Sequence, residues 1–586
     1  MNRSLWLMFV SLLVFANQKQ LYAQSKNNNA ALQEVDLFFE NGIVYTVNDE
    51  NTVAQCLAVK NDKIIFVGSN DEGKQYRDVS KEIIDLKGGM LLPGFIDGHI
   101  HTITPAFFDF VLFGDSDIPS ILQTVIKFVH ENPHQDVYYG FGYNAGIFEG
   151  DELDKGPKKE RLDAICMDKP VIIYALDGHS VWLNSKGFEY CNITKESYCP
   201  PGGEIVKDKI TGELWGAVLN SAMSLIPDPP LSPERLSTVL QEFQYFLNSL
   251  GYTSIMTVPG NGYLAVYWDG YYELEQNNLL TLRVRAAEIL KPYNIEQDFL
   301  RIKELRKKYN SDLLKLTAAK IFTDGIIASK TAFLLQPYFN TNEYGEAIWT
   351  QDDLNKVYTM VNEEGLSVHI HSIGDAAVKM ALDAAEYAKQ HTQNNDLRNA
   401  ITHLQLVDNN DLPRFKELNV LPVLQTFWHF KQPGAWLPIE LPVLGAEKAE
   451  TEYPLRSFVT HGAMPIFSSD FPVTSVPYPF YAIEIGVTRN LPDGPAYGAS
   501  DDITDMNDPK YLLQPAERLD MMTMIRGYTA NAAYLISAED VTGSLEVGKL
   551  ADMIVIDQNL FDIEPLEISN TKVLKTYFKG KLVFEN

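Results

Sequence analysis

Two histidines two residues apart, His99 and His101, follow an apolar run in the sequence GGMLLPGFIDGHIHT. Side chains i and i+2 of a β-strand project from the same face, so both imidazoles are expected to point toward one place, with Asp97 on the same alternation. Neutral imidazoles that converge are a common start of a zinc site. The pair alone also fits two ordinary histidines at a strand end, so the rest of the chain has to be considered with it.

Four further polar residues lie in or just after other apolar, strand-like runs: Lys320, His371, His403 and Asp470. Each has a structural explanation by itself, such as a packed histidine, a lysine with a buried stem or an aspartate that caps a helix. Together they would leave several buried polar groups unpaired, at about 1–3 kcal/mol each, and a shared metal removes that cost. We therefore predict a metal centre, in which either His369 or His371 remains a candidate for a mere packing role.

The elements that must position these residues are apolar runs that alternate with helical segments, which favours a parallel α/β fold. Eight such runs predict a TIM-like (β/α)8 barrel, whose functional groups gather at the carboxyl ends of its strands. The runs are residues 91–99, 253–258, 282–290, 314–325, 366–374, 400–407, 421–426 and 464–473.

The two ends of the chain differ from this middle part because short β-type runs alternate there with turns. We predict that residues 35–88 and 541–586 pair into one composite β-sandwich domain. Residues 89–540 then form the barrel, with a large insertion, about residues 103–250, after its first strand.

Composition limits the partners and the compartment. The chain has 586 residues and a formal net charge of −28 without a long acidic block, and an acidic surface repels nucleic acids. Residues 1–23 combine Arg3, an apolar core and a plausible cleavage site, which predicts a signal peptide. The apolar core is too short to span a membrane. We expect an exported, periplasmic or secreted protein with no membrane attachment after cleavage.

Two other patterns are set aside. The cysteines Cys56, Cys166, Cys191 and Cys199 contain no CxxC, which excludes thiolate zinc ribbons, although export would allow a disulfide between Cys191 and Cys199. Residues 130–134 match the zincin pattern HExxH, which needs a continuous helix, and Pro133 interrupts any helix there.

The chain resembles the metal-dependent amidohydrolase superfamily, specifically the amidohydrolase-3 branch that includes N-substituted formamide deformylases. The resemblance covers nearly the whole chain after residue 23. It is carried, in this order, by motifs such as LLPGFIDGHIHT, LDGHSVWLNS, KIFTDGIIASKTA, HIHSIGDAAV, ITHLQLV, FSSDFPV and GSLEVGKLADMIVID. It implies a TIM-like barrel with a β-sandwich built from both chain ends, in agreement with the pattern of strands.

The resemblance also implies roles for the candidate ligands. His99 and His101 would hold one divalent metal, His371 and His403 a second, and Asp470 would touch the first metal and act as acid and base. Lys320 matches a lysine that is carboxylated in many relatives and then bridges two metals. The implied cofactor is one or two Zn²⁺ ions, with a carbamate on Lys320 as an open alternative to the free amine.

The expected reaction is hydrolysis of a C–N bond other than a peptide bond, in an amide, formamide or cyclic amide, by a metal-activated hydroxide. We expect a small-molecule substrate beside His179, Tyr143, Trp428 and His429. Three alternatives stay open: a mononuclear deaminase, an ester hydrolase on the same barrel, and an exported binding protein with a vestigial site. A homo-oligomer is also compatible with the sequence.

Overall fold

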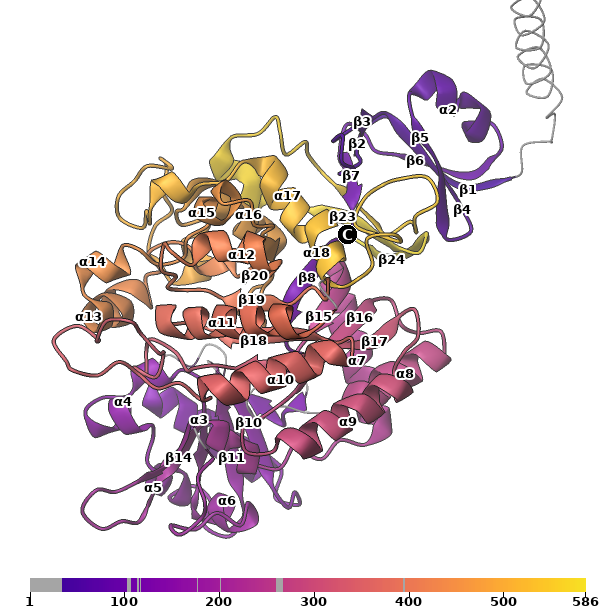
Figure 1. Ribbon diagram of the computed structural model, residues 1–586. Helices are drawn as coiled ribbons and strands as arrows, with labels where there is room; N and C mark the ends of the chain where they lie inside the picture. The colour runs from indigo at the N-terminus through magenta and orange to yellow at the C-terminus, as the bar shows by residue number, and fades with distance from the viewer. Residues whose placement is uncertain are drawn as a thin grey trace, which may run out of the picture.

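The computed structural model describes residues 34–586, except residues 103–106, 113–114, 116, 177, 201, 260–266 and 394–395. Figure 1 shows a central barrel with an insertion on one side and a smaller β-structure on the other. The predicted signal peptide, residues 1–23, lies outside the described residues. Among the helices that the structure describes, none has both the length and the apolar character needed to cross a bilayer.

The central sheet contains eight parallel strands, and each strand that the sequence predicted is one of them. Neighbours follow chain order around the barrel, so the predicted (β/α)8 fold is confirmed. The strands are β8 (Phe95–Ile100), β15 (Tyr252–Thr257), β16 (Arg283–Ile289), β17 (Leu314–Phe322), β18 (Ser367–Ser372), β19 (Ala400–His403), β20 (Leu421–Leu424) and β21 (Ile466–Phe467).

Backbone hydrogen bonds join the segment after β21 to β8. The amide of Asp470 donates to the carbonyl of His99 over 2.9 Å, and the amide of His101 donates to the carbonyl of Phe471 over 2.9 Å. These bonds connect the last strand region to the first strand, so the carboxyl ends of the strands surround one space.

Helices cover the barrel because each has one apolar face. In α10 (Gln351–Glu363) the buried residues Leu354, Val357 and Val361 recur at a spacing of three and four, and the Thr350 side chain caps the first turn. The other long helices of the barrel are α7 (Pro233–Ser249), α8 (Tyr267–Gln276), α9 (Ile295–Lys308), α11 (Asp375–His391), α12 (Leu412–Leu418), α16 (Pro479–Thr488), α17 (Met521–Tyr528) and α18 (Ala530–Leu535).

Both ends of the chain contribute to one sheet, as predicted. In that sheet, of order β24-β23-β22-β7-β2-β3, β7 pairs antiparallel with β22. A second sheet, β5-β4-β1-β6, comes from the amino-terminal part alone and shares an apolar core with the first. The strands are β1 (Val35–Glu40), β2 (Ile43–Tyr45), β3 (Val53–Ala54), β4 (Cys56–Lys60), β5 (Lys63–Gly68), β6 (Ser80–Asp85), β7 (Met90–Pro93), β22 (Met553–Ile556), β23 (Val573–Phe578) and β24 (Lys581–Glu585), with α2 (Asn70–Arg77) before β6.

The run that the sequence predicted as the first barrel strand is divided between two sheets. Its first half is β7 of the composite sheet, its second half is β8 of the barrel, and only Gly94 lies between them. A Cβ atom at this glycine would lie 2.3 Å from Cγ2 of Thr253 on β15. The glycine therefore permits the close approach at which the chain changes sheets.

The insertion between β8 and β15 has a six-stranded sheet of order β13-β14-β12-β11-β10-β9. Its strands are β9 (Phe110–Val111), β10 (Tyr138–Tyr143), β11 (Val171–Ala175), β12 (Ser180–Leu183), β13 (Gly203–Lys207) and β14 (Leu214–Asn220), and its helices are α3 (Ile118–Glu131), α4 (Asp151–Lys155), α5 (Lys159–Asp163) and α6 (Ser185–Tyr190).

Two sequence patterns fall within this insertion. Helix α3 ends at Glu131, before Pro133, so residues 130–134 do not form the continuous helix that a zincin HExxH motif needs. Cys191 and Cys199 are free thiols, so the disulfide that export would allow is absent.

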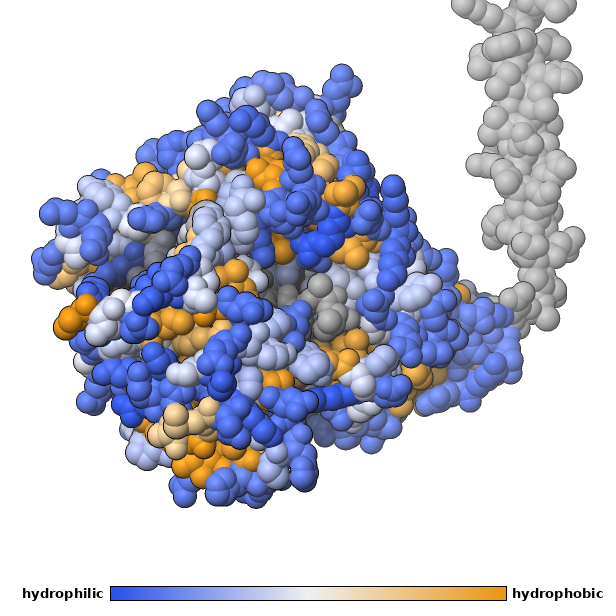
Figure 2. Space-filling view, turned by 90° about the horizontal axis from the view of Figure 1, so that it is seen from below, coloured by the Kyte–Doolittle hydropathy of each residue, from blue (hydrophilic) through white to orange (hydrophobic). Residues whose placement is uncertain are grey.

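One face of the molecule is mostly hydrophilic. On the face shown in Figure 2, hydrophilic side chains cover most of the described surface, and the hydrophobic ones form small separate groups. Scattered apolar side chains of this kind are normal on a folded protein.

A buried ion pair connects the barrel to the composite sheet. Nη1 of Arg283, at the start of β16, lies 2.8 Å from Oδ2 of Asp552, and both side chains are almost fully buried. The second oxygen of Asp552 accepts a hydrogen bond from the amide of Lys579. Asp552, in the motif GKLADMIVID, therefore supplies the negative charge that neutralises Arg283 where the barrel meets the composite sheet.

We expect Asp552→Ala to lower the free energy of unfolding by about 3–5 kcal/mol, because it leaves the guanidinium of Arg283 buried without its counter-ion. Urea unfolding followed by circular dichroism measures this. The control, Lys81→Ala, removes the exposed pair with Asp36 and should change stability little. A loss below about 1 kcal/mol for Asp552→Ala would contradict the assigned role.

Candidate metal centre

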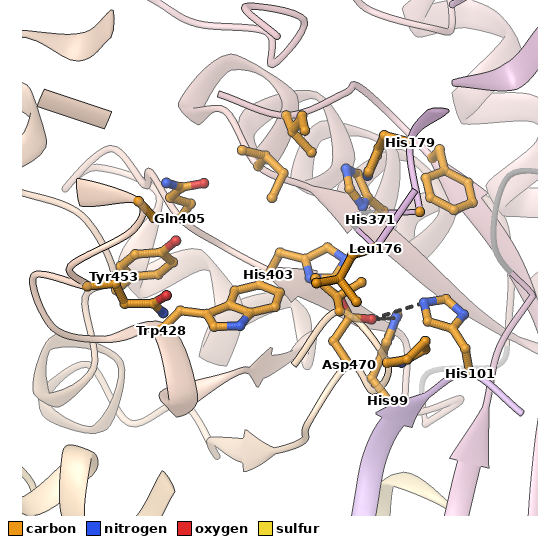
Figure 3. A pocket seen from close by; sticks show the side chains of 18 of the residues that line it. His99, His101, Leu176, His179, His371, His403, Gln405, Trp428, Tyr453 and Asp470 are labelled. Carbon is orange, nitrogen blue, oxygen red and sulfur yellow. Dashed lines mark ion pairs between the residues drawn. The ribbon is translucent and has the colours of Figure 1, made fainter. Parts of the chain in front are cut away.

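Three buried side chains bring their donor atoms together where the barrel closes. Oδ1 of Asp470 lies 3.2 Å from Nε2 of His99 and 3.0 Å from Nε2 of His101. All three donor atoms lie within 4.8 Å of one another, which suits one metal ion (Figure 3). The predicted convergence of the two imidazoles at the end of the first barrel strand is present.

In His99 and His101, a hydrogen bond at Nδ1 leaves Nε2, the nitrogen that faces Asp470, with a free lone pair. Nδ1 of His101 lies 2.9 Å from the carbonyl oxygen of Val258, to which only a protonated nitrogen can bond. Nδ1 of His99 lies 2.7 Å from Nε2 of His369 on β18. When Nδ1 carries the proton in each ring, both Nε2 atoms are available to a metal.

His371 and His403 form a second pair of rings beside the first. Their ring centroids are 4.5 Å apart, and Nδ1 of His403 lies 4.0 Å from Oδ2 of Asp470. His403 Nδ1 bonds to Oε1 of Gln425 over 3.0 Å, and His371 Nε2 bonds to the carbonyl of Gly325 over 3.1 Å. Each ring therefore has its other nitrogen available as an acceptor or a metal ligand.

Lys320 lies on β17, paired in register with His369 of β18, and its side chain is fully buried. Its Nζ has no hydrogen-bond partner among the described residues and lies 4.6 Å from the centre of the Phe322 ring. Burial lowers the pKa of this amine to about 7, against a smaller opposing effect of the Asp470 charge. A large share of the amine is therefore uncharged at neutral pH.

Two of these residues have a left-handed backbone, with φ of 56° at Asp470 and 76° at His403. Residues other than glycine adopt this region rarely, and such residues cluster at active sites. The strand ends therefore bend at the two positions that turn these side chains into the shared space.

The chemistry of this donor set fits a divalent metal. Nε2 of His99 and Oδ1 of Asp470 are buried and form no hydrogen bond within the described part of the chain. Burial is the largest cause that lowers the pKa of His99, His371 and His403 well below the usual range, so the rings are neutral, as metal ligands must be. A bound cation would satisfy the unpaired atoms that otherwise cost free energy.

A cavity of about 270 Å³ opens onto these donors. His179 and Trp428, both predicted to contact substrate, line it. The Trp428 ring stacks near His403, with centroids 5.9 Å apart, and its Nε1 donates to Oγ1 of Thr474. The insertion contributes His179, whose Nδ1 bonds to Oδ1 of Asn220.

Tyr143 and His429, the other two residues predicted at the substrate, are not among the residues that line this cavity. Tyr143 is buried in the core of the insertion, where its hydroxyl bonds to Ser180. His429 is fully buried and stacks on Tyr453, which does line the cavity. His429 therefore supports the cavity wall from behind, through Tyr453.

The sequence profile of the amidohydrolase family designated Amidohydro_3 matches residues 82–584. The chain belongs to this amidohydrolase family. Its similarity to N-substituted formamide deformylase of Arthrobacter pascens extends over 94% of this chain and 98% of that protein, at 23% identity. The chain is thus a metal-dependent hydrolase of the amidohydrolase type, with His99, His101 and Asp470 as its metal-site group.

Solved structures share the fold of this amidohydrolase. An uncharacterized metal-dependent hydrolase from Pyrococcus horikoshii matches with a TM-score of 0.68 at 23% identity, over 90% of this chain and 99% of that one. An adenosine deaminase from Xanthomonas campestris with bound zinc matches with a TM-score of 0.51 at 13% identity, over 93% and 92% of the two chains.

The sequence placed Asp97 beside the two imidazoles but did not show that it holds the donors in place, and it assigned no role to Gln425. The carboxylate of Asp97 accepts hydrogen bonds from the amides of His99 and Ser469, so it positions the backbone on both sides of the closure. Burial raises the pKa of Asp97 to about 7. Gln425 orients His403 and is itself held by the hydroxyl of Ser468. In the sequence, Gln425 could have been noticed as a polar residue at the end of the apolar run LPVLQ, the position at which the other site residues were found.

In this amidohydrolase we expect His369→Phe to lower metal affinity roughly 10–100-fold, because His99 Nδ1 loses the acceptor that selects its proton position. Competition with a chelator, followed by elemental analysis, measures the affinity. His391→Phe, an exposed histidine on α11, is the matched control. Wild-type affinity in His369→Phe would show that this ring only fills space.

Proposed function

We propose that this amidohydrolase uses zinc to hydrolyse a C–N bond other than a peptide bond in a small amide, formamide or cyclic amide. The observation that carries the proposal is the grouping of His99, His101 and Asp470 at the inner end of a cavity. The similarity to N-substituted formamide deformylase over nearly the whole chain supports this bond type. The zinc-bound deaminase of the same fold supports the choice of metal.

His99, His101 and Asp470 would hold the first ion, and His371 with His403 a second. Bound zinc supplies Lewis acidity and lowers the pKa of water. The protein residues do the remaining work. Asp470, which reaches both histidine pairs through its two oxygens, is placed to accept a proton from water and to return it to the leaving nitrogen. Trp428 and His179 form walls that limit where the substrate lies.

Lys320 would complete a two-metal site as a carbamate. Its uncharged amine can add to carbon dioxide through a new N–C bond, with release of one N–H proton. The anionic carbamate oxygens are ligands that a divalent cation accepts, whereas an ammonium group would repel it. The position of Lys320 on β17, beside the strand that carries His369 and His371, supports this role. Its unpaired, fully buried nitrogen supports it further.

We expect Asp470→Asn to lower turnover of a cleaved N-substituted formamide by roughly 10²–10⁴-fold, because the amide cannot accept the proton. Formate release measures the rate, and elemental analysis checks that metal is retained. Asp501→Asn, which alters an exposed carboxylate, is the control. Unchanged turnover in Asp470→Asn would remove this residue from proton transfer. If a compound with an amino group on a ring releases ammonia in the same assay, the deaminase alternative is favoured instead.

We expect Lys320→Ala to reduce the metal content from about two ions per chain toward one, with partial recovery in the presence of a short carboxylic acid. Bicarbonate should speed reconstitution of the wild-type apoprotein but not of the variant. The control is Lys315→Ala at the other end of the same strand. Full metal content in Lys320→Ala, or reconstitution that is indifferent to bicarbonate, would contradict the carbamate.

A further inference from the structure

The cavity has a second polar end, away from the metal-site group. Gln405, Glu440 and Tyr453 line it together with Trp428. Figure 3 shows Gln405 and Tyr453 at the opposite end from His101, with Trp428 between them. The reaction proposed above does not use Gln405, Glu440 or Tyr453, so these three need an explanation of their own.

One amide holds two carboxylates there. Nε2 of Gln405 donates to Oε1 of Glu440 over 3.1 Å and to Oε1 of Glu452 over 2.5 Å. The Tyr453 hydroxyl also bonds to Glu440. Glu452 is fully buried behind the cavity wall, whereas Glu440 reaches the cavity itself.

Neither carboxylate has a basic partner within the part of the chain that the structure describes. No ion pair involves Glu440 or Glu452 there, and Oε2 of the buried Glu452 makes no hydrogen bond. Burial raises the pKa of Glu440 to about 7 and that of Glu452 well above its usual value, the latter also because Glu440 is close. Without a cation these two carboxyls therefore favour their protonated forms, and a cation bound beside Glu440 would favour its charged form.

The backbone at this end is also unusual. Tyr453 has a φ of 60°, a conformation that bulky residues rarely adopt, and its amide donates to the carbonyl of Gln405. This backbone conformation accompanies the close approach of the 452–453 segment to Gln405. Strained backbone of this kind persists where the surroundings hold it for a functional arrangement.

We infer that Gln405, Glu440, Glu452 and Tyr453 form a cation-binding subsite, and that the substrate is a small amide that carries an ammonium or guanidinium group. A cation in this position would pair with Glu440 at the cavity surface. The face of Trp428 offers a further attraction for the same cation. That the substrate is an amide rests on the proposed function, whereas the binding of a cation at this subsite does not.

The alternatives fit the cavity less well. A carboxylate or phosphate group would meet two acids and no basic side chain at this end. A neutral group would gain nothing from the charged form of Glu440. The cavity of about 270 Å³ is below the range of roughly 300–1,000 Å³ that is typical for drug-sized ligands, so the cation must belong to a small molecule.

Calorimetric binding of n-butylguanidinium and n-butylurea to the metal-loaded protein tests the subsite directly. The two ligands share size and planarity, and only the first is charged. We expect the guanidinium to bind roughly 10–100-fold more tightly, and Glu440→Gln to remove most of that preference. Glu447→Gln, which removes an exposed carboxylate nearby on α14 (Ala446–Ala449), should keep it.

Equal binding of the two ligands to the wild-type protein would overturn the inference, and this comparison holds even if Glu440→Gln does not fold. A preference that persists in a folded Glu440→Gln would overturn it as well.

Turnover separates this inference from the proposed function. N-formyl diamines with three to six carbons are compared with N-formyl alkylamines in which methyl replaces the ammonium group. Hydrolysis consumes one water, breaks the C–N bond and gives formate and the amine. We expect the best diamine derivative to exceed its neutral analogue at least tenfold in kcat/KM. Cleavage without this preference contradicts the subsite, whereas guanidinium binding without any cleavage contradicts the proposed function.

Discussion

The amide of Asp470 donates to the carbonyl of His99, and the amide of His101 donates to the carbonyl of Phe471. These two bonds join the segment after the last barrel strand to the first strand, and they involve the same residues whose side chains converge on one point. The carboxylate of Asp97 bonds to amides on both sides of this closure. The donor group therefore exists only when the barrel is closed, and small errors in the register between β21 and β8 would separate its members.

The cavity beyond the closure has two unlike ends. Near the donors, burial lowers the pKa of His99, His371, His403 and Lys320, so this end is prepared for a metal cation and its ligands. At the far end, Glu440 and Glu452 share the amide of Gln405 and form no ion pair among the described residues. A cation bound there would favour the charged form of Glu440, and in a site with little water that pair would orient the ligand strongly. A substrate with one charged end and one amide would therefore have a single favourable direction in the cavity.

Much of the fold could be predicted from the sequence because the buried strands of a parallel barrel are continuous apolar runs, against which a polar residue at a strand end is conspicuous. His101 and Asp470 were found in this way. Glu440 and Glu452 were not, because they lie in short helical and turn segments where no period indicates which side chains meet. His429 was placed at the substrate by its residue type, but the tight turn after β20 directs its ring behind Tyr453. Contacts of this kind depend on tertiary packing alone.

The composite sheet has a consequence for how the protein is made. Strand β7 receives its neighbour β22 only about 460 residues later along the chain. At a synthesis rate of ~5–20 residues per second, that partner leaves the ribosome roughly 20–90 s after β7. Throughout this interval the nascent chain carries an incomplete sheet edge next to apolar barrel strands, the arrangement most open to pairing with other chains. Because of this topology, any cell that produces the enzyme has to protect the nascent chain from aggregation during translation.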